Sequence, residues 1–294
     1  MIIMDIAYYP GCSLHSMAKE YDISTKLVCQ RLGINLHEVP DWNCCGATAA
    51  HSLDHKLSVS LSGRNLSLVD DMKLKQVTTP CAGCFNRLKT ASIEMKSDSK
   101  AAEMEKRLGV SLAGARKVEV AHILQVMIEE IGLQIIKEKV VKPLKGMKVA
   151  SYSGCLLTRP RSIVQFDDSE QPMVLDNILD ALGAEPVKWS HKAECCGGGF
   201  AASDTDIVVD LGGQVLEAAR QAGADVIVTA CPMCQANLDT RQEIIEKERG
   251  IKYNLPIVYY TQLMGLAFGY SARQMGFNRL LTRPSALLAT WGLA

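Results

Sequence analysis

Apolar positions along the chain follow two alternating periods. Short runs rich in β-branched and aromatic residues predict strands, and longer stretches in which apolar residues recur every three or four positions predict amphipathic helices. The predicted strands are 2–9, 148–152 and 226–229, and the predicted helices are 20–32, 54–72, 172–182 and 206–222. Strands that alternate with helices are typical of an α/β fold in which helices flank a mainly parallel sheet.

This pattern occurs twice, so the chain contains an internal repeat. The sequence IAYYPG precedes Cys12 and VASYSG precedes Cys155, while QVTTPCAGC at 76–84 resembles IVTACPMC at 227–234. We therefore expect two tandem, pseudo-symmetric domains, residues 1–142 and 143–294, with the break in a basic segment that contains Pro143 and Gly146. Residues 158–171 are extra relative to the first half and are expected to form a loop. Residues after Arg241 are expected to have no counterpart in the first half and to form a C-terminal extension.

Composition and charge exclude several classes of partner. Of the 294 residues 48% are hydrophobic, and 32 basic residues balance 32 acidic ones, so no overall charge favours nucleic acid or an anionic membrane surface. The most apolar late stretch, 255–268, is interrupted by polar residues and is shorter than the roughly 20 residues that a membrane helix needs. The beginning of the chain does not resemble a signal peptide. We expect a cytoplasmic protein with no membrane span and no nucleic-acid partner.

Ten of the eleven cysteines form two sets with the same spacing. Each set has a single cysteine, a long gap, an adjacent pair followed by glycine, a second long gap and a C-x-x-C motif. The first set is Cys12, Cys44, Cys45, Cys81 and Cys84, and the second is Cys155, Cys195, Cys196, Cys231 and Cys234. Cys29 lies outside both and is expected to be a buried core thiol. Because disulfides are disfavoured in the cytoplasm, so many cysteines indicate metal binding or redox chemistry.

Three kinds of chemistry fit these cysteines. A structural zinc site needs four ligands, and neighbouring cysteines do not readily chelate one ion, so sets of five favour a polynuclear iron–sulfur centre. A scaffold with two zinc sites remains an alternative, as does thiol–disulfide exchange at one of the C-x-x-C motifs. Each cysteine group follows a predicted strand or begins a predicted helix, which is where open α/β sheets bind ligands and where main-chain N–H groups favour anions.

The spacing resembles that of the CCG-domain family, and in particular the B subunits of the soluble heterodisulfide reductases of methanogenic archaea. The resemblance extends over essentially the whole chain. It implies an electron-transferring oxidoreductase of methanogenesis with two noncubane 4Fe-4S clusters, each held by one set of five cysteines. The implied reaction is the reduction of the coenzyme M–coenzyme B heterodisulfide to two thiols. The motif is also shared by thiol–fumarate reductases and by proteins linked to lactate or glycolate oxidation, which are alternatives.

The resemblance also implies partners and further site residues. This sequence has neither closely spaced cubane ligands nor a dinucleotide-binding G-x-G-x-x-G motif. Electrons would therefore come from the ferredoxin-like C subunit and the flavin-containing A subunit of the heterodisulfide reductase, with a hydrogenase or formate dehydrogenase upstream. His15, His191 and Lys192 are candidate proton donors. The basic residues near the cysteines are candidates to bind the sulfonate of coenzyme M and the phosphate of coenzyme B: Arg87, Arg159, Arg161, Lys188 and Lys192.

Overall fold

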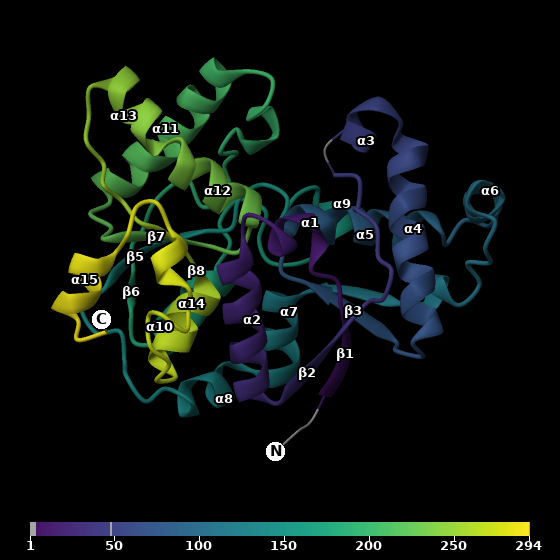
Figure 1. Cartoon of the computed structure of the whole chain (residues 1–294), viewed down its shortest axis with the longest axis horizontal. Helices are drawn as coiled ribbons and strands as arrows, with labels where there is room; N and C mark the ends of the chain where they lie inside the picture. Colours follow the sequence, from purple (N-terminus) through teal and green to yellow (C-terminus); the bar gives the residue numbers. More distant parts are fainter. Residues whose placement is uncertain (1–3, 48, 294) are drawn as a thin grey trace.

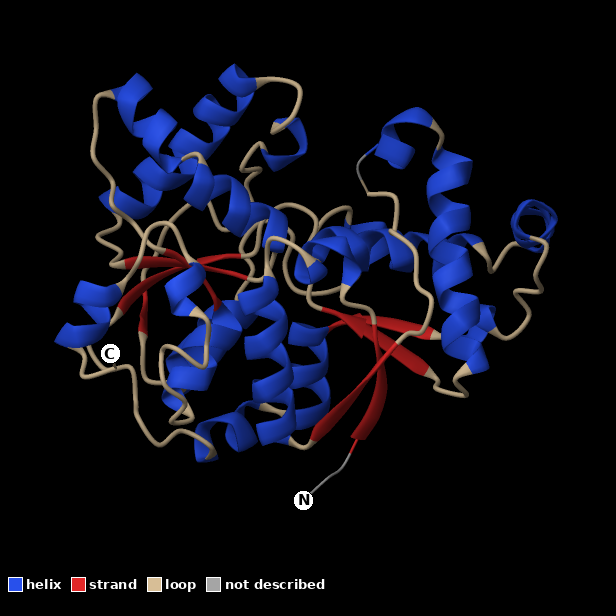
Figure 2. Ribbon diagram, viewed as in Figure 1, coloured by secondary structure: helices blue, strands red, loops and turns tan. Residues whose placement is uncertain are grey.

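Two four-stranded parallel sheets, each flanked by helices, form the two halves of the computed structural model (Figures 1 and 2). The structure describes residues 4–47 and 49–293. The first sheet has the order β2-β1-β3-β4 and the second has the order β6-β5-β7-β8. The strands are β1 Met4–Tyr8, β2 Ile34–Glu38, β3 Gln76–Thr79, β4 Glu119–His122, β5 Lys148–Tyr152, β6 Glu185–Pro186, β7 Val226–Thr229 and β8 Ile257–Tyr259. This arrangement confirms the predicted α/β class and the repeat.

Helices cover the sheets in both halves. In the first half they are α1 Gly11–His15, α2 Lys19–Leu32, α3 Ala49–Leu53, α4 His55–Asp71, α5 Ala82–Glu94, α6 Asp98–Leu108, α7 Ile123–Val126 and α8 Leu133–Glu138, with η1 Ala115–Lys117 and the π-helical turn η2 Met127–Ile131. In the second half they are α9 Arg161–Val164, α10 Val174–Ala181, η3 Gly198–Phe200, α11 Thr205–Gln221, α12 Pro232–Thr240, α13 Gln242–Arg249, α14 Tyr260–Ala267, η4 Phe277–Arg279 and α15 Ser285–Thr290.

The predicted helices and strands are confirmed to within one or two residues wherever the structure describes them. The predicted first strand began at Ile2, which lies outside the described residues. Equivalent aspartates begin the long helix that follows the CCG motif in each half. Asp54 accepts hydrogen bonds from the main-chain N–H groups at the start of α4, and Asp204 does the same for α11. These N-caps satisfy N–H groups that have no partner within the helix.

One prediction about the C-terminal part of the chain is wrong. Residues after Arg241 do have a counterpart, because β8 occupies the same place in its sheet as β4 does. Both strands pair in parallel with the strand that precedes a C-x-x-C motif. Their sequences, EVAH and IVY, share no motif. The connection from β3 to β4 is also longer than the equivalent connection from β7 to β8. The topology is therefore repeated where the sequence similarity has been lost.

The two halves pack tightly against each other, and α2 of the first half lies along α14 of the second (Figure 1). Tyr21 stacks on Tyr259 with ring centroids 3.9 Å apart, and the buried hydroxyls of Ser24 and Thr261 are 2.7 Å apart. A single apolar core consequently runs through both halves. The expected break near Lys142 falls between α8 and β5 and stays a prediction. No helix among the described residues is both long enough and apolar enough to cross a membrane.

Candidate metal centres

The repeated topology brings the cysteine groups to the carboxyl ends of the central strands. Cys12 lies in α1 directly after β1, and Cys155 follows β5 at the equivalent place. Cys81 follows β3 as the N-cap of α5, and Cys231 follows β7 as the N-cap of α12. Parallel strands have their carboxyl ends at one edge of the sheet, where α/β proteins usually bind ligands. The loops that carry the cysteines therefore converge in each half.

The five thiols of the first half lie in contact with one another. The Sγ atoms of Cys45 and Cys84 are 3.4 Å apart, and the main-chain N–H of Cys84 donates to Sγ of Cys81 at 3.4 Å. Hydrogen bonds from the thiols of Cys12 and Cys45, with that of Cys12 the stronger cause, lower the pKa of Cys44 to about 2. The same hydrogen bond to Cys44 is the main cause that raises the pKa of Cys12. So many adjacent thiols cannot all ionise without a nearby positive charge.

The second half repeats these contacts. A hydrogen bond from Cys155 lowers the pKa of Cys195 to about 6, and the main-chain N–H of Gly197 donates to Sγ of Cys195 at 3.3 Å. A hydrogen bond to Cys196 is the main cause that raises the pKa of Cys234. The first cysteine of each adjacent pair is thus paired with the single cysteine of its own set, which lowers its pKa. In the second half the pKa of Cys231 is also well below its usual value, because Cys234 and Cys81 donate hydrogen bonds to it.

The two sets meet at one point between the halves. A hydrogen bond to Cys231 is the main cause that raises the pKa of Cys81, and both thiols are buried. The two cysteines begin the C-x-x-C motifs of opposite halves. The ten thiols therefore form two groups that touch, rather than two separate sites.

The residues present fit a polynuclear iron–sulfur group. Ten soft sulfur donors gather in two equivalent sets, and metal ions hold coordinating thiols in the ionised form. Among the described residues, no three His, Cys, Asp or Glu side chains surround a point suited to a single metal ion. The assignment of individual ligands stays a prediction. Cys29 is buried in α2, outside both sets, as expected.

The two candidate histidines have other partners. His15 lies in α1 with its side chain about half exposed, and its Nε2 is 3.0 Å from a carboxylate oxygen of Glu38. Its ring also packs edge-on against Trp42 at 5.1 Å. His191 lies beside Trp189, and its Nδ1 is 2.8 Å from the hydroxyl oxygen of Ser190. A role for either residue as a proton donor stays a prediction.

Lys192 forms a buried ion pair. Its Nζ donates to Oδ2 of Asp176 at 2.8 Å, and the same oxygen accepts from the hydroxyl of Ser151. The main-chain carbonyl of Lys192 accepts from the N–H groups of Ser153 and Gly154, which immediately precede Cys155. Lys192 therefore fixes the loop that carries the first cysteine of the second set.

Replacing Lys192 by methionine is expected to lower the free energy of unfolding by about 3 kcal/mol, because Asp176 would be left charged and buried without its partner. Urea denaturation measures the change. The matched control is Lys26→Met, which breaks an exposed pair with Asp22 and should cost less than about 0.5 kcal/mol. Equal losses in the two variants would contradict the structural role of the buried pair.

The candidate anion-binding residues are placed differently from one another. Arg87 lies near Cys45 and donates to Nδ1 of His51 at 2.8 Å. Arg159 is paired with Glu170 at 2.9 Å, and Arg161 and Lys188 are exposed. Sequence reasoning did not single out His51, although its position shortly after the first CCG motif was a usable signal.

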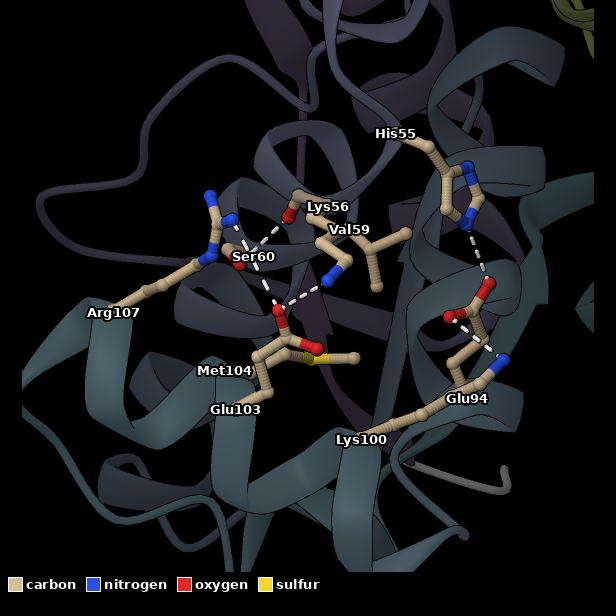
Figure 3. A pocket seen from close by; sticks show the side chains of 9 residues that line it. All are labelled: His55, Lys56, Val59, Ser60, Glu94, Lys100, Glu103, Met104 and Arg107. Carbon is tan, nitrogen blue, oxygen red and sulfur yellow. Dashed lines mark hydrogen bonds and ion pairs between the residues drawn. The ribbon is translucent and has the colours of Figure 1, made fainter.

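A cavity of about 160 Å³ between α4 and α6 is separate from the cysteines (Figure 3). Its charged side chains pair with one another: Nε2 of His55 is 2.7 Å from Glu94, and Nζ of Lys56 is 2.6 Å from Glu103. No cysteine lines this cavity. It is therefore not part of the candidate centres.

Comparison with known proteins identifies the repeat. The cysteine-rich domain family CCG matches residues 6–89 and again residues 149–239. The chain is 32% identical to the B subunit of the ferredoxin:CoB-CoM heterodisulfide reductase of Methanosarcina mazei, over 93% of this chain and 92% of that one. It is also 32% identical to the 8-methylmenaquinol:fumarate reductase membrane anchor subunit of Wolinella succinogenes, over 93% of this chain and 95% of that one.

A solved structure shares the fold. The crystal structure of a hypothetical protein from Helicobacter pylori matches with a TM-score of 0.73 at 11% identity, over 96% of this chain and 53% of that one. This chain thus spans about half the length of that protein. The two family matches together cover more than half of the chain, and the relatives match nearly all of it. The chain therefore belongs to the CCG family of cysteine-rich iron–sulfur oxidoreductases, which confirms the resemblance to heterodisulfide reductase B subunits.

Proposed function

We propose that the chain is a catalytic subunit that reduces the coenzyme M–coenzyme B heterodisulfide to its two thiols. Two noncubane 4Fe-4S clusters would each be held by one set of five cysteines. The observation that carries this proposal is the contact between Cys81 and Cys231, which joins two equivalent thiol sets at one place. The substrate disulfide has two sulfur atoms, and each of two adjacent, equivalent centres could bind one of them.

The reaction takes up two electrons and two protons, breaks one S–S bond and forms two S–H bonds. The clusters would supply the electrons. The residues of the chain would bind the substrate and deliver the protons. Arg87 and His51, beside the first set, are suited to a sulfonate or phosphate group. The proton-donor candidates remain His15, His191 and Lys192, of which Lys192 already donates to Asp176.

Electrons would reach this protein from partners. Relatives of the chain are named as subunits of larger enzymes, including the D subunit of the dihydromethanophenazine:CoB–CoM heterodisulfide reductase of Methanosarcina barkeri. We propose the ferredoxin-like C subunit of a heterodisulfide reductase as the direct electron donor, with the flavin-containing A subunit next in the chain of electron transfer. A hydrogenase or formate dehydrogenase would supply electrons to the flavin, and the complex would be cytoplasmic.

Metal analysis and a disulfide assay on anaerobically purified protein test the proposal. About eight irons and eight sulfides per chain are expected, four of each for every cluster. Reduction of the heterodisulfide by a chemically reduced dye should then depend on that iron. Two zinc ions without iron would contradict the proposal and favour a zinc scaffold. Addition of coenzyme M under oxidising conditions should also produce an EPR signal that broadens when its thiol carries a magnetic sulfur isotope.

A second candidate function is participation in a quinol:fumarate reductase. The relative from Wolinella succinogenes matches as closely, and over as much of the chain, as the relative from Methanosarcina mazei. The same iron-loaded preparation distinguishes the two functions. Turnover of the heterodisulfide by the chain alone supports the first, whereas turnover of fumarate only in the presence of a partner, with no disulfide reduction, supports the second.

A further inference from the structure

A buried side chain holds the main-chain carbonyl of Cys196, the second cysteine of its CCG motif. Nδ2 of Asn237 donates to this carbonyl at 2.8 Å, and Asn237 is only 4% exposed. Asn237 lies in α12, three residues after Cys234 of the C-x-x-C motif. The bond therefore ties the turn that carries the adjacent cysteine pair directly to the helix that carries Cys234.

This is the only hydrogen bond that the Asn237 side chain makes within the described part of the chain, because its Oδ1 is buried and has no partner. Burying an amide costs free energy unless hydrogen bonds compensate for the lost water. A leucine of similar shape would fill the same space without that cost, so packing alone does not explain an asparagine here. The contact that requires the amide is the one to the carbonyl of Cys196.

A second residue of the same helix holds the other end of the segment that follows the CCG motif. Nη2 of Arg241, the C-cap of α12, donates to the main-chain carbonyl of Ala201 at 3.1 Å. Cys196 and Ala201 lie on either side of the short helix η3. Within η3, an added Cβ at Gly198 would be 3.3 Å from Sγ of Cys196 and 3.5 Å from Cβ of Asn237. The segment is thus packed closely on α12.

The first half holds the equivalent turn in a different way. The main-chain carbonyl of Cys45 accepts a hydrogen bond from the hydroxyl of Ser62 at 3.1 Å. Ser62 lies in α4, a helix without cysteines. Arg87, which follows its C-x-x-C motif by three residues as Asn237 does, donates to His51 instead. The same main-chain group is therefore held by different helices in the two halves.

The position that corresponds to Ser62 in the second half is a glycine. Ser62 lies eight residues after Asp54, the N-cap of α4. Gly212 lies eight residues after Asp204, the N-cap of α11. An added Cβ at Gly212 would be 3.5 Å from the carbonyl oxygen of Cys196, so a serine hydroxyl there could reach it. The second half has the place for a serine but not the serine, and α12 supplies the hydrogen bond instead.

We propose that Asn237 is a positioning residue for the second metal centre, where it fixes Cys196 relative to Cys234. Residues that orient a metal ligand without touching the metal typically contribute about ten- to a hundredfold to metal affinity or activity. Asn237 acts in this way on the second half alone. The inference rests on the proposed function only in taking Cys196 and Cys234 as ligands of one iron–sulfur centre, and it does not depend on the identity of the disulfide.

The rate at which anaerobically purified, iron-loaded protein releases iron to a chelator tests the inference. Asn237→Leu removes the donor and keeps a side chain of similar shape. About half of its iron should be released at least about tenfold faster than from the wild type, while the other half is released at the wild-type rate. Purification of Asn237→Leu with half of the wild-type iron and one EPR-active centre fewer would support the inference equally.

Gln242→Leu is the matched control for the loss of a buried amide. Nε2 of Gln242 donates to the main-chain carbonyl of Leu255 at 2.9 Å, and Gln242 is also buried. Leu255 precedes β8, so this bond lies at the opposite edge of the sheet from the cysteines. Gln242→Leu should lower the midpoint of urea denaturation at least as much as Asn237→Leu, yet release its iron at the wild-type rate.

A serine placed as in the first half provides a rescue. In the Asn237→Leu background, Gly212→Ser supplies a hydroxyl to the carbonyl of Cys196. Ile245→Val accompanies it, because Cδ1 of Ile245 would be 3.0 Å from the new Cβ. The triple variant should regain slow release of all its iron, since the hydrogen bond returns from another helix. The pair Gly212→Ser and Ile245→Val, without the change at Asn237, shows what these two substitutions cost by themselves.

Several results would overturn the inference. These are wild-type release of iron from Asn237→Leu, equally faster release of all its iron, and release from Gln242→Leu as fast as from Asn237→Leu. A triple variant without rescue would also overturn it if the pair at Gly212 and Ile245 alone behaves as the wild type.

Iron content and disulfide turnover of the wild type separate this inference from the proposed function. Wild-type protein that binds iron but does not reduce the heterodisulfide contradicts the function alone, and the release experiment still decides the role of Asn237. Wild-type protein without iron contradicts both.

Discussion

Replacing Cys196 by alanine is expected to lower the iron content by about half, since one of the two clusters is lost, and to reduce disulfide turnover at least about a hundredfold. Replacing a residue that only hydrogen-bonds to a metal ligand typically lowers metal affinity or activity by about ten- to a hundredfold, so replacing a ligand itself should lower activity at least as much. Cys196 is buried and hydrogen-bonded to Cys234, so water cannot easily replace its sulfur. Cys45 has the same place in the first half and should give the same result. Iron analysis and a turnover assay measure both effects.

The chain contains a matched control for these two variants. Cys29 is fully buried in α2 and belongs to neither set. Cys29→Ala removes the same atoms from a packed interior, so it should cost about 1 kcal/mol of stability while iron content and turnover stay at the wild-type level. Full activity of Cys45→Ala or Cys196→Ala would contradict the ligand assignment. Equal loss of iron from Cys29→Ala would mean that the iron reports on folding rather than on ligands.

Most of the fold could be predicted because its elements carry strong local signals. The run at β7 is buried and consists of β-branched residues, while the run at β5 is buried after its first residue and ends in tyrosine, and the bounds of both are as predicted. The long helices α4 and α11 begin directly after aspartate N-caps. The short edge strands β6 and β8 carry no such signal, since two or three residues cannot show a period and β6 contains a proline. Their places follow from pairing with neighbouring strands.

The composition of the site was easier to predict than its arrangement. Spacing alone separates the ten cysteines into two sets and leaves out Cys29. The contact between Cys81 and Cys231 depends on how the two halves pack, including the stacking of Tyr21 on Tyr259, and no short sequence motif encodes that packing.

Lys192 illustrates a different limit of sequence reasoning. Its position three residues before the second CCG motif suggested a proton donor, and that role stays a prediction. Its ion-pair partner, Asp176, comes from α10, whose face toward β5 is set by packing. A charged residue near a motif can thus serve to hold the loop that carries it, and only the location of the opposite charge distinguishes the two roles.

Replacing Gly11 or Gly154 by alanine is expected to displace the segment that carries the first cysteine of the corresponding set, so that the half concerned loses its iron. Both glycines have positive φ, +71° and +67°, and precede Cys12 and Cys155. An added Cβ would lie 2.9 Å from Sγ of Cys84 at Gly11 and 2.9 Å from Sγ of Cys234 at Gly154. This is closer than a carbon atom and a sulfur atom can approach, so a thiol that is needed as a ligand must move. Iron analysis measures the loss, and the number of EPR-active centres per chain shows whether one or both halves have lost their iron.

The backbone cost of these substitutions can be separated from the clash. Gly109 and Gly250 also have positive φ, +69° and +64°, but an added Cβ at either position would have no neighbour within 4 Å. An alanine at any one of these four positions should therefore lower the free energy of unfolding by a similar amount, roughly 1–2 kcal/mol, because alanine must adopt the left-handed conformation there. Only the variants at Gly11 and Gly154 should also lose iron and turnover. If Gly109→Ala and Gly250→Ala lost as much iron, general destabilisation would explain the result. If Gly11→Ala and Gly154→Ala kept all of it, the close approach of these loops to Cys84 and Cys234 would not be required for the centres to form.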